Sequence, residues 1–512
     1  MKRTITPLLN TFFKRNNSSL VTRESLNSNL LEAQYAVRGE LVLRAQSHQA
    51  VLRGSSTISP NSSKLPFNKL VFCNIGNPME LGQKPITFFR QVTSLLTFPA
   101  LIDDPRSTAI FPPDAIARAK AYMSATNGSG IGAYTHSQGI ELIRKEVSQF
   151  ITRRDGGIAS HADDIFLTDG ASPAVQMILK ALIRGKSDAV MVPVPQYPLY
   201  SASIALFGGS FAPFYLNEEK GWSLDLPELE RSIAEARSKG LNVRALVVIN
   251  PGNPTGNSLS EANIRDVLTF ASREKLVVLA DEVYQENVYV SDRPFISFKK
   301  VAVQMGLLDA NNSHDASRGL QLASFHSTSK GFTGECGRRG GFVELCGFDA
   351  GVRAELYKLA SISLCSNTAG QVTVGLQALP PQPGDASYAL YVQERDAILA
   401  SLKRRAEKVV TALRKLEGLT CELVEGALYA FPQIRLPIRA VNAAKAAGKQ
   451  PDTFYCLALL DATGVCVVPG SGFSQREGTY HFRCTILPPE AEFDTVLNSV
   501  SLFHKNFMKQ WS

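Results

Sequence analysis

The chain lacks long apolar runs, closely spaced cysteine pairs and, over most of its length, an excess of either charge. No stretch of about 18 or more apolar residues occurs, so no transmembrane helix is expected. The eight cysteines are dispersed and include no C-x-x-C pair, which favours buried reduced thiols in an intracellular compartment over a disulfide framework. With 512 residues, the chain is long enough for two or three domains.

Positive charge is concentrated at the N-terminus. The formal net charge is +8, and the first 30 residues carry five basic side chains against the single acid Glu24. The remainder is nearly balanced, so nucleic-acid binding is not expected. Apolar side chains at helical spacing lie among the basic ones: Ile5, Leu8, Leu9, Phe12 and Phe13. This pattern is typical of a mitochondrial presequence, and a disordered tail on a cytoplasmic protein explains it equally well.

Short apolar runs alternate with helical patterns in the middle of the chain. Strands are expected at residues 165–168, 189–192, 244–249, 276–280 and 320–325. Because these strands are apolar throughout, they indicate an α/β fold with a mostly parallel sheet that is covered on both faces. Ligands of such sheets bind beyond the carboxyl ends of the strands.

Helices complete this outline. One is expected from 138 to 154 with Ser137 as its N-cap, another over 260–274, and a long charged one from 389 to about 416. The residues that follow alternate short strands and helices, which is typical of a smaller α+β unit.

The segment that follows the strand at 320–325 is the most informative. Here Lys330 stands among the hydroxyl groups of Ser327, Thr328 and Ser329. An amine at the end of a buried strand can form a Schiff base, and the hydroxyls can hold a phosphate. Pyridoxal 5′-phosphate offers both an aldehyde and a phosphate, whereas the simpler interpretation is a solvated loop.

Two other strand ends supply groups that suit the same cofactor. Asp281 ends the strand at 276–280, where a carboxylate could keep a pyridine nitrogen protonated. Tyr284 could hydrogen-bond the phenolic oxygen of the ring, and Asn253, in a turn made rigid by two prolines, could donate to the same oxygen. A cap or a salt bridge would also explain the aspartate.

Two other segments contain candidate residues for binding a phosphate and a substrate carboxylate. Ser172 begins a helix after Asp169-Gly170-Ala171, where free N–H groups favour an anion, and an arginine after Lys330 would complete the cradle. Arg483 lies in an apolar run that reads as a strand. A buried arginine there either forms an internal salt bridge or binds a substrate α-carboxylate.

Together these segments resemble pyridoxal-phosphate enzymes of the aspartate aminotransferase fold (fold type I). Over about residues 27–505 the resemblance to the alanine aminotransferases is closer. It is carried by ordered runs at 34–40, 74–78, 82–88, 134–137, 195–200, 334–337 and 468–473, for example Gly334-Glu335-Cys336-Gly337 and Val468-Pro469-Gly470-Ser471-Gly472-Phe473. One departure is Cys365-Ser366-Asn367-Thr368, where relatives have Cys-Pro-Asn-Val, and it affects a local loop.

The resemblance implies a role for each matching residue. Lys330 would bind the cofactor aldehyde and move the proton at the substrate Cα. The other residues implied to bind the cofactor are Ala171, Ser172, Tyr197, Asn253, Asp281, Tyr284, Ser327, Arg339 and, from the neighbouring subunit of a homodimer, Tyr134. Gly76, Asn253 and Arg483 would bind the substrate. Arg339 is favoured over Arg338 for the phosphate. The resemblance does not indicate which residues accommodate the glutamate side chain; Arg38 is one candidate, and a structural role near the N-terminal segment explains Arg38 equally well.

The resemblance predicts ping-pong transamination of L-alanine and 2-oxoglutarate to pyruvate and L-glutamate, so the partners are small amino acids and 2-oxo acids. Two rivals are a glutamate–glyoxylate aminotransferase and a non-enzymatic regulator with an aminotransferase-like domain. The regulator would need a DNA-binding module, for which residues 1–26 leave no room.

The expected organisation has four parts. Residues 1–26 form an N-terminal extension, residues 27–110 form an N-terminal segment with part of the small domain, residues 111–375 form the large cofactor-binding domain, and residues 376–512 complete the small domain.

Overall fold

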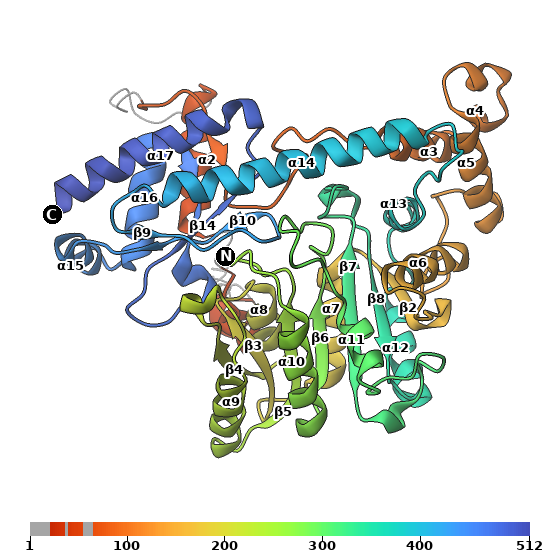
Figure 1. Ribbon diagram of the computed structural model, residues 1–512, viewed down its shortest axis with the longest axis horizontal. Coiled ribbons are helices and arrows are strands. Elements are labelled where there is room, and N and C mark those ends of the chain that lie inside the picture. Colours follow the sequence, from red (N-terminus) through yellow and green to blue (C-terminus); the bar gives the residue numbers. More distant parts are fainter. Residues whose placement is uncertain (1–20, 36–38, 55–64) are drawn as a thin grey trace, which may run out of the picture.

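The computed structural model describes residues 21–35, 39–54 and 65–512. A seven-stranded sheet in the order β2-β8-β7-β6-β5-β3-β4 forms its centre (Figure 1). The strands are β2 (Ile165–Thr168), β3 (Asp188–Val194), β4 (Ser210–Tyr215), β5 (Asn242–Ile249), β6 (Val277–Asp281), β7 (Gln321–Ser327) and β8 (Gly341–Cys346). Only β8 in this sheet runs antiparallel to its neighbours. The predicted α/β fold with a mostly parallel sheet is therefore confirmed.

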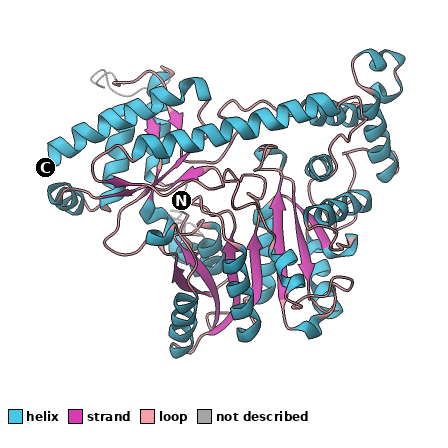
Figure 2. Cartoon of the chain, viewed as in Figure 1, coloured by secondary structure: helices cyan, strands magenta, loops and turns pink. Residues whose placement is uncertain are grey.

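Both faces of the sheet are buried, which explains why its strands are apolar throughout. In β5, Val247 packs on one side, while Leu246 and Val248 pack on the other. One face is covered by α7 (Ala171–Leu182), α8 (Leu199–Leu206) and α12 (Ala350–Ile362), and the opposite face by α9 (Leu226–Ser238), α10 (Glu261–Glu274) and α11 (Phe298–Gln304). Figure 2 shows helices on both sides of the strands.

Beyond the edge strand β2, a group of helices encloses an apolar core that is separate from the two cores on the faces of the sheet. Its members are α3 (Thr87–Thr97), α4 (Ala100–Asp103), α5 (Pro113–Ala125), α6 (Glu141–Arg154) and α13 (Thr368–Ala378). The prediction that α6 begins at residue 138 with Ser137 as its N-cap is wrong. The Ser137 hydroxyl instead donates to the carbonyl of Leu364 over 2.7 Å, and the helix begins at Glu141.

The C-terminal part surrounds a separate core and includes residues from the N-terminal segment. Its helices are α14 (Tyr388–Leu413), α15 (Ile438–Ala446), α16 (Pro451–Thr463) and α17 (Glu490–Trp511), with α2 (Glu40–Leu52) packed on α16. Its short strands are β9 (Leu419–Thr420), β10 (Tyr429–Ala430), β11 (Gln433–Ile434), β12 (Val465–Cys466), β13 (Val468–Pro469) and β14 (Phe482–Thr485). The long helix α14 runs along the top of Figure 1 towards α3.

Two further elements lie in the N-terminal segment. The strand β1 (Val71–Phe72) pairs in parallel with β12, and the short helix α1 (Ser28–Glu32) packs on α8. This pairing joins the N-terminal segment to the C-terminal core. The four-part division of the chain stays a prediction.

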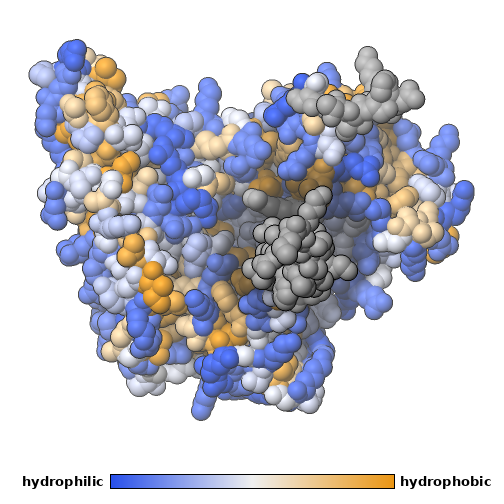
Figure 3. All heavy atoms as spheres, turned by 180° about the vertical axis from the view of Figure 1, so that it is seen from behind, coloured by the Kyte–Doolittle hydropathy of each residue, from blue (hydrophilic) through white to orange (hydrophobic). Residues whose placement is uncertain are grey.

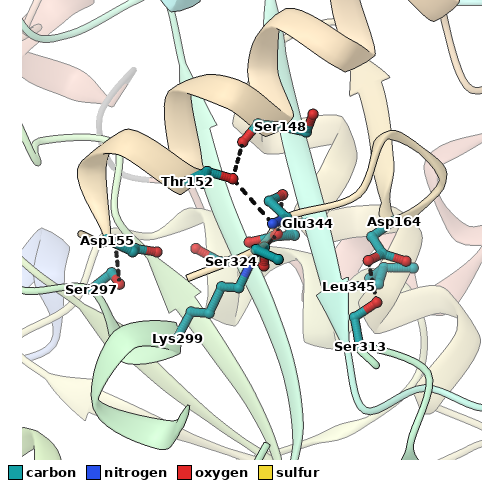
Figure 4. A network of polar contacts seen from close by, with 12 residues as sticks. Ser148, Thr152, Asp155, Asp164, Ser297, Lys299, Ser313, Ser324, Glu344 and Leu345 are labelled. Carbon is teal, nitrogen blue, oxygen red and sulfur yellow. Dashed lines mark hydrogen bonds and ion pairs between the residues drawn. The ribbon is translucent and has the colours of Figure 1, made fainter. Parts of the chain in front are cut away.

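A buried polar network lies between α6, α11 and β8 (Figure 4). Lys299 Nζ donates to Glu344 Oε1 over 2.6 Å and to the carbonyl of Ala159 over 2.8 Å. The Lys299 and Glu344 side chains are only 4% and 1% exposed. Beside them, Ser297 donates to Asp155 over 2.8 Å. Buried charges of this kind depend on their partners, because an isolated charge in the interior is costly.

Outside the core, polar and apolar side chains are interspersed on the face seen in Figure 3. No helix in the described ranges is long and apolar enough to span a bilayer. All eight cysteines are free, five of them buried. Most of the presequence-like segment, and Arg38, lie outside the described residues.

Candidate active site

The predicted site residues converge on one cavity at the carboxyl ends of β5, β6 and β7. Its volume is about 320 Å³. Eleven of the twelve predicted residues line it: Gly76, Ala171, Ser172, Tyr197, Asn253, Asp281, Tyr284, Ser327, Lys330, Arg339 and Arg483. A larger groove of about 1010 Å³ gathers none of them. The chemistry of the lining, rather than volume, therefore identifies the candidate site.

Tyr134 is the predicted residue that does not line this cavity. Its side chain is 78% exposed. An exposed tyrosine is compatible with its expected contact, which lies in a neighbouring subunit.

Lys330 presents its amine inside the cavity. It follows β7 after a two-residue turn, and its Nζ donates to the carbonyl of Gly76 over 2.7 Å. The amine also lies 5.8 Å from the centroid of the Tyr284 ring. The contact with Gly76 brings the N-terminal segment against the end of the central sheet.

Asp281, the last residue of β6, lies buried at the cavity wall. Its Oδ2 accepts a hydrogen bond from the Tyr200 hydroxyl over 2.8 Å. Burial raises the pKa of the Asp281 carboxyl to about 6, although the Tyr200 hydrogen bond and the charge of Lys330 oppose this shift. A cation beside Asp281 would reverse the effect of burial and favour the carboxylate. Tyr200 had not been predicted, although the run at 195–200 contains it.

Tyr284, Asn253 and Tyr429 form a small hydrogen-bonded group. Asn253 Nδ2 donates to Tyr284 Oη over 3.4 Å, and Tyr284 Oη donates to Tyr429 Oη over 3.1 Å. Sequence reasoning missed Tyr429, because it lies in a short apolar run that looks like ordinary core.

Arg483 in β14 (Phe482–Thr485) is a buried cation. It is 2% exposed, and no carboxylate in the described part of the chain forms an ion pair with it. Its guanidinium carbon lies 4.2 Å from the Tyr429 ring centroid and 4.7 Å from that of Phe473. Nη1 donates to Asn253 Oδ1 over 2.9 Å and Nη2 to the carbonyl of Asn74, while Nε is left unpaired. An uncompensated buried charge with a free donor points to an anionic ligand.

The N-terminus of α7 forms another part of the cavity wall. Gly170 stands at the N-cap with φ 91°, and no side chain among the described residues caps the free N–H groups of this helix. A Cβ at Gly170 would lie 2.6 Å from Arg339 Nη2, so a glycine is needed for this approach. Arg339 Nη2 donates to the carbonyl of Asp169 over 2.7 Å. Ser172 and Ser327 line the same cavity, and together these groups form a place for an anion.

The neighbouring Arg338 lies differently. It does not line the cavity, and its Nε lies 3.8 Å from Glu335 Oε2. The geometry therefore favours Arg339 over Arg338 as the anion-binding arginine.

Tyr197 and Tyr35 both line the cavity, and Tyr35 is the third residue, after Tyr200 and Tyr429, that the sequence analysis did not single out. Their hydroxyl oxygens are 2.9 Å apart, and the rings meet edge to face with centroids 6.4 Å apart. Tyr35 is 41% exposed. It comes from the segment before α2, far from Tyr197 in sequence, so no local pattern could have indicated the contact.

The residues present fit pyridoxal phosphate. The uncapped N-terminus of α7 suits a phosphate, the Lys330 amine suits an aldehyde, and the Asp281 carboxylate suits a protonated ring nitrogen. With its mostly parallel sheet and smaller C-terminal unit, the chain has the aspartate-aminotransferase-like fold of the fold type I enzymes.

The chain belongs to the class I and II aminotransferases, whose family model matches residues 103–500. It is 52% identical to the probable mitochondrial alanine aminotransferase of Dictyostelium discoideum, over 98% of this chain and 92% of that protein. It is also 52% identical to glutamate–glyoxylate aminotransferase 2 of Arabidopsis thaliana, over 96% of this chain and 97% of that protein.

Solved structures agree on the fold. An alanine aminotransferase from Pyrococcus furiosus superposes with a TM-score of 0.71 at 23% identity, covering 94% of this chain and all of that one. The predicted membership of the aminotransferase family is confirmed.

Proposed function

We propose that this aminotransferase uses pyridoxal 5′-phosphate to interconvert L-alanine and 2-oxoglutarate with pyruvate and L-glutamate. The observation that supports the reaction class is the buried guanidinium of Arg483, which forms no ion pair within the described residues and lies in the same cavity as the Lys330 amine. Such a cation suits the α-carboxylate that all amino-acid and 2-oxo-acid substrates share. The choice of alanine is supported by the similarity to the Dictyostelium discoideum enzyme over almost the whole chain.

When bound, the cofactor supplies an electron-withdrawing ring that carries the amino group between the two half-reactions. Asp281 would hold the ring nitrogen by charge, while Asn253 and Tyr284 would donate to the ring oxygen and Tyr197 would stack on the ring. Ala171, Ser172, Ser327 and Arg339 would hold the phosphate.

Two side chains would act on the substrate. Arg483 would bind the α-carboxylate through parallel N–H donors and so orient Cα. Lys330 would then move the proton at that Cα, acting as base and acid in turn. Gly76 has no side chain, which leaves space beside the amine of Lys330.

The direct test is a steady-state panel on the purified full-length protein, with added cofactor and each combination of amino donor and 2-oxo acid. We expect L-alanine with 2-oxoglutarate, and L-glutamate with pyruvate, to give ping-pong kinetics. Activity confined to other amino acids would contradict the proposal.

A glutamate–glyoxylate aminotransferase is the second candidate, supported by the equal identity to the Arabidopsis thaliana protein. Both activities call on the same site residues. The ratio of kcat/KM for pyruvate to that for glyoxylate, with L-glutamate as donor, decides between them.

We further propose a homodimer in which Tyr134 of one subunit reaches the phosphate site of the other. The exposure of Tyr134, at 78%, supports this arrangement. A molar mass from light scattering that equals one chain would contradict it.

The compartment is either mitochondrial or cytoplasmic. The name of the Dictyostelium discoideum relative and the basic N-terminal segment support mitochondria. Fusion of residues 1–30 to a fluorescent reporter tests this choice, and diffuse cytoplasmic signal would favour the alternative.

A further inference from the structure

Tyr429 places a buried hydroxyl in the cavity next to the groups assigned above. It lies in β10, which pairs with β14, the strand that carries Arg483. The side chain is 2% exposed and lines the cavity, so its hydroxyl is shielded from bulk water. Tyr284 Oη is its one hydrogen-bond partner in the described part of the chain.

The surrounding residues leave room for this hydroxyl. A Cβ at Gly76 would collide with Tyr429 Oη and would lie 3.1 Å from Lys330 Nζ. The Tyr429 and Lys330 side chains therefore both extend into the space that a side chain at residue 76 would occupy.

The ring of Tyr429 has a separate contact. It lies face-on below the Arg483 guanidinium, with 4.2 Å from the guanidinium carbon to the ring centroid. It also meets the Tyr284 ring edge to face, with the centroids 5.9 Å apart and the planes at 83°. One side chain thus contacts both the cation proposed for the substrate and the phenol proposed for the cofactor.

We propose that Tyr429 is a positioning residue, whose hydroxyl orients and polarises the Tyr284 phenol and whose ring holds the Arg483 guanidinium. This inference deepens the proposed function and rests on it.

The Tyr284 and Tyr429 hydroxyls each have one hydrogen, which limits which of them can donate to the other. Tyr284 has one hydroxyl hydrogen, and if this donates to the ring oxygen of the cofactor it can no longer donate to Tyr429. The contact over 3.1 Å persists only if Tyr429 becomes the donor, which requires rotation of hydrogens and no movement of heavy atoms. Each hydrogen bond in such a chain strengthens the next, so Tyr429 would help Tyr284 to stabilise an anionic ring oxygen.

The charges around Tyr429 favour its role as a donor. Burial alone would raise the pKa of the Tyr429 hydroxyl, but the charges of Lys330 and Arg483, together with the hydrogen bond from Tyr284, lower it overall. The other titratable groups that act on this pair of tyrosines are Asp281 and Cys336. None of these four groups is changed by the substitution used as a test.

The test is the substitution Tyr429→Phe, which removes the hydroxyl and keeps the ring. The readout is a pH titration of the absorbance of the cofactor bound to the full-length protein, without substrate. We expect the pH at the midpoint of this absorbance change to rise by about half a unit, the size expected for one lost hydrogen bond. Because the ring is retained, the KM for L-alanine should stay within about twofold. The larger change Tyr429→Leu should raise KM as well.

Two controls separate this role from a general loss of packing. Tyr122→Phe removes another buried hydroxyl, one that donates to Glu146 over 2.8 Å and does not line the cavity, and it should leave the absorbance transition unchanged. In a Tyr284→Phe background, Tyr429→Phe should add no further shift, because its effect passes through Tyr284.

A Tyr429→Phe transition equal to that of the unsubstituted protein would overturn the inference. So would a shift of the same size in the Tyr284→Phe background. If the unsubstituted protein bound no cofactor and showed no titrating band, the proposed function would fail and this inference with it, which is a separate and recognisable result.

Discussion

The substitution Arg483→Ala tests whether the buried cation exists for the substrate. In the structure this guanidinium lies between two aromatic rings and donates hydrogen bonds to Asn253 and Asn74. It has no carboxylate partner among the described residues. If it binds an α-carboxylate, the variant loses two charge-assisted hydrogen bonds of about 1.5–3 kcal/mol each. The sum, roughly 3–6 kcal/mol, corresponds to a fall in kcat/KM of about 10²–10⁴.

The assay should isolate the carboxylate. The protein loaded with cofactor is mixed with L-alanine, and the change in cofactor absorbance is followed through a single half-reaction. The same measurement is made with ethylamine, which has the amine of alanine and lacks its carboxylate. We expect Arg483→Ala to lose most of its rate with L-alanine and little of its slow rate with ethylamine.

Arg483→Lys is the matched variant, because it keeps the charge and loses the planar fork of donors. Its rate with L-alanine should lie between those of Arg483→Ala and the unsubstituted protein. The reasoning is refuted if Arg483→Ala slows L-alanine and ethylamine equally. That result would mean that Arg483 merely holds Asn253 and Asn74 in place.

Three further predictions use other parts of the structure. Lys330→Ala should abolish the visible absorbance of bound cofactor and lower turnover by about 10²–10⁴ or more, as measured by spectrum and steady-state rate. Because burial raises the pKa of Asp281 to about 6, and a cationic ring nitrogen needs the carboxylate, cofactor affinity should fall about tenfold per pH unit below that value. The phosphate of the cofactor titrates in the same range. The quantity to measure is therefore the difference between the unsubstituted protein and Asp281→Asn, which should vanish if Asp281 is not involved. Lys299→Met should destabilise the protein by about 3–5 kcal/mol, since it leaves the buried Glu344 carboxylate without its ion-pair partner (Figure 4). The double substitution Lys299→Met with Glu344→Leu should recover most of this loss, as measured by thermal unfolding.

The central sheet was predictable because its signals are local. Continuous apolar runs located the strands at 165–168, 189–192, 244–249, 276–280 and 320–325, and the structure has a strand at each. The convergence of Asp281, Asn253 and Lys330 then followed from geometry, since parallel strands that end at one edge bring their following residues together. Their roles toward the cofactor stay predictions.

What the sequence did not indicate depends on contacts between distant segments. Ser137 looked like an N-cap, but its hydroxyl donates to the carbonyl of Leu364, more than 200 residues away. Tyr429 looked like core because only the pairing of β10 with β14 brings it under Arg483. Tyr35 contacts Tyr197 although the two residues are 162 positions apart in the chain. Propensity and spacing carry no information on such approaches.

The N-terminal segment connects the two halves of the site. The carbonyl of Asn74 accepts from Arg483, and that of Gly76 accepts from Lys330, so two residues that are close in sequence hold the cation and the amine. The backbone of Cys73 next to them is fixed by bonds to Cys466 and Thr485, which belong to the C-terminal core. The distance between the Arg483 guanidinium and the Lys330 amine is therefore set by how this segment docks. If Arg483 and Lys330 have the roles proposed above, a change in that docking would alter substrate orientation and proton transfer together, whereas a change in either side chain alone would affect one of them.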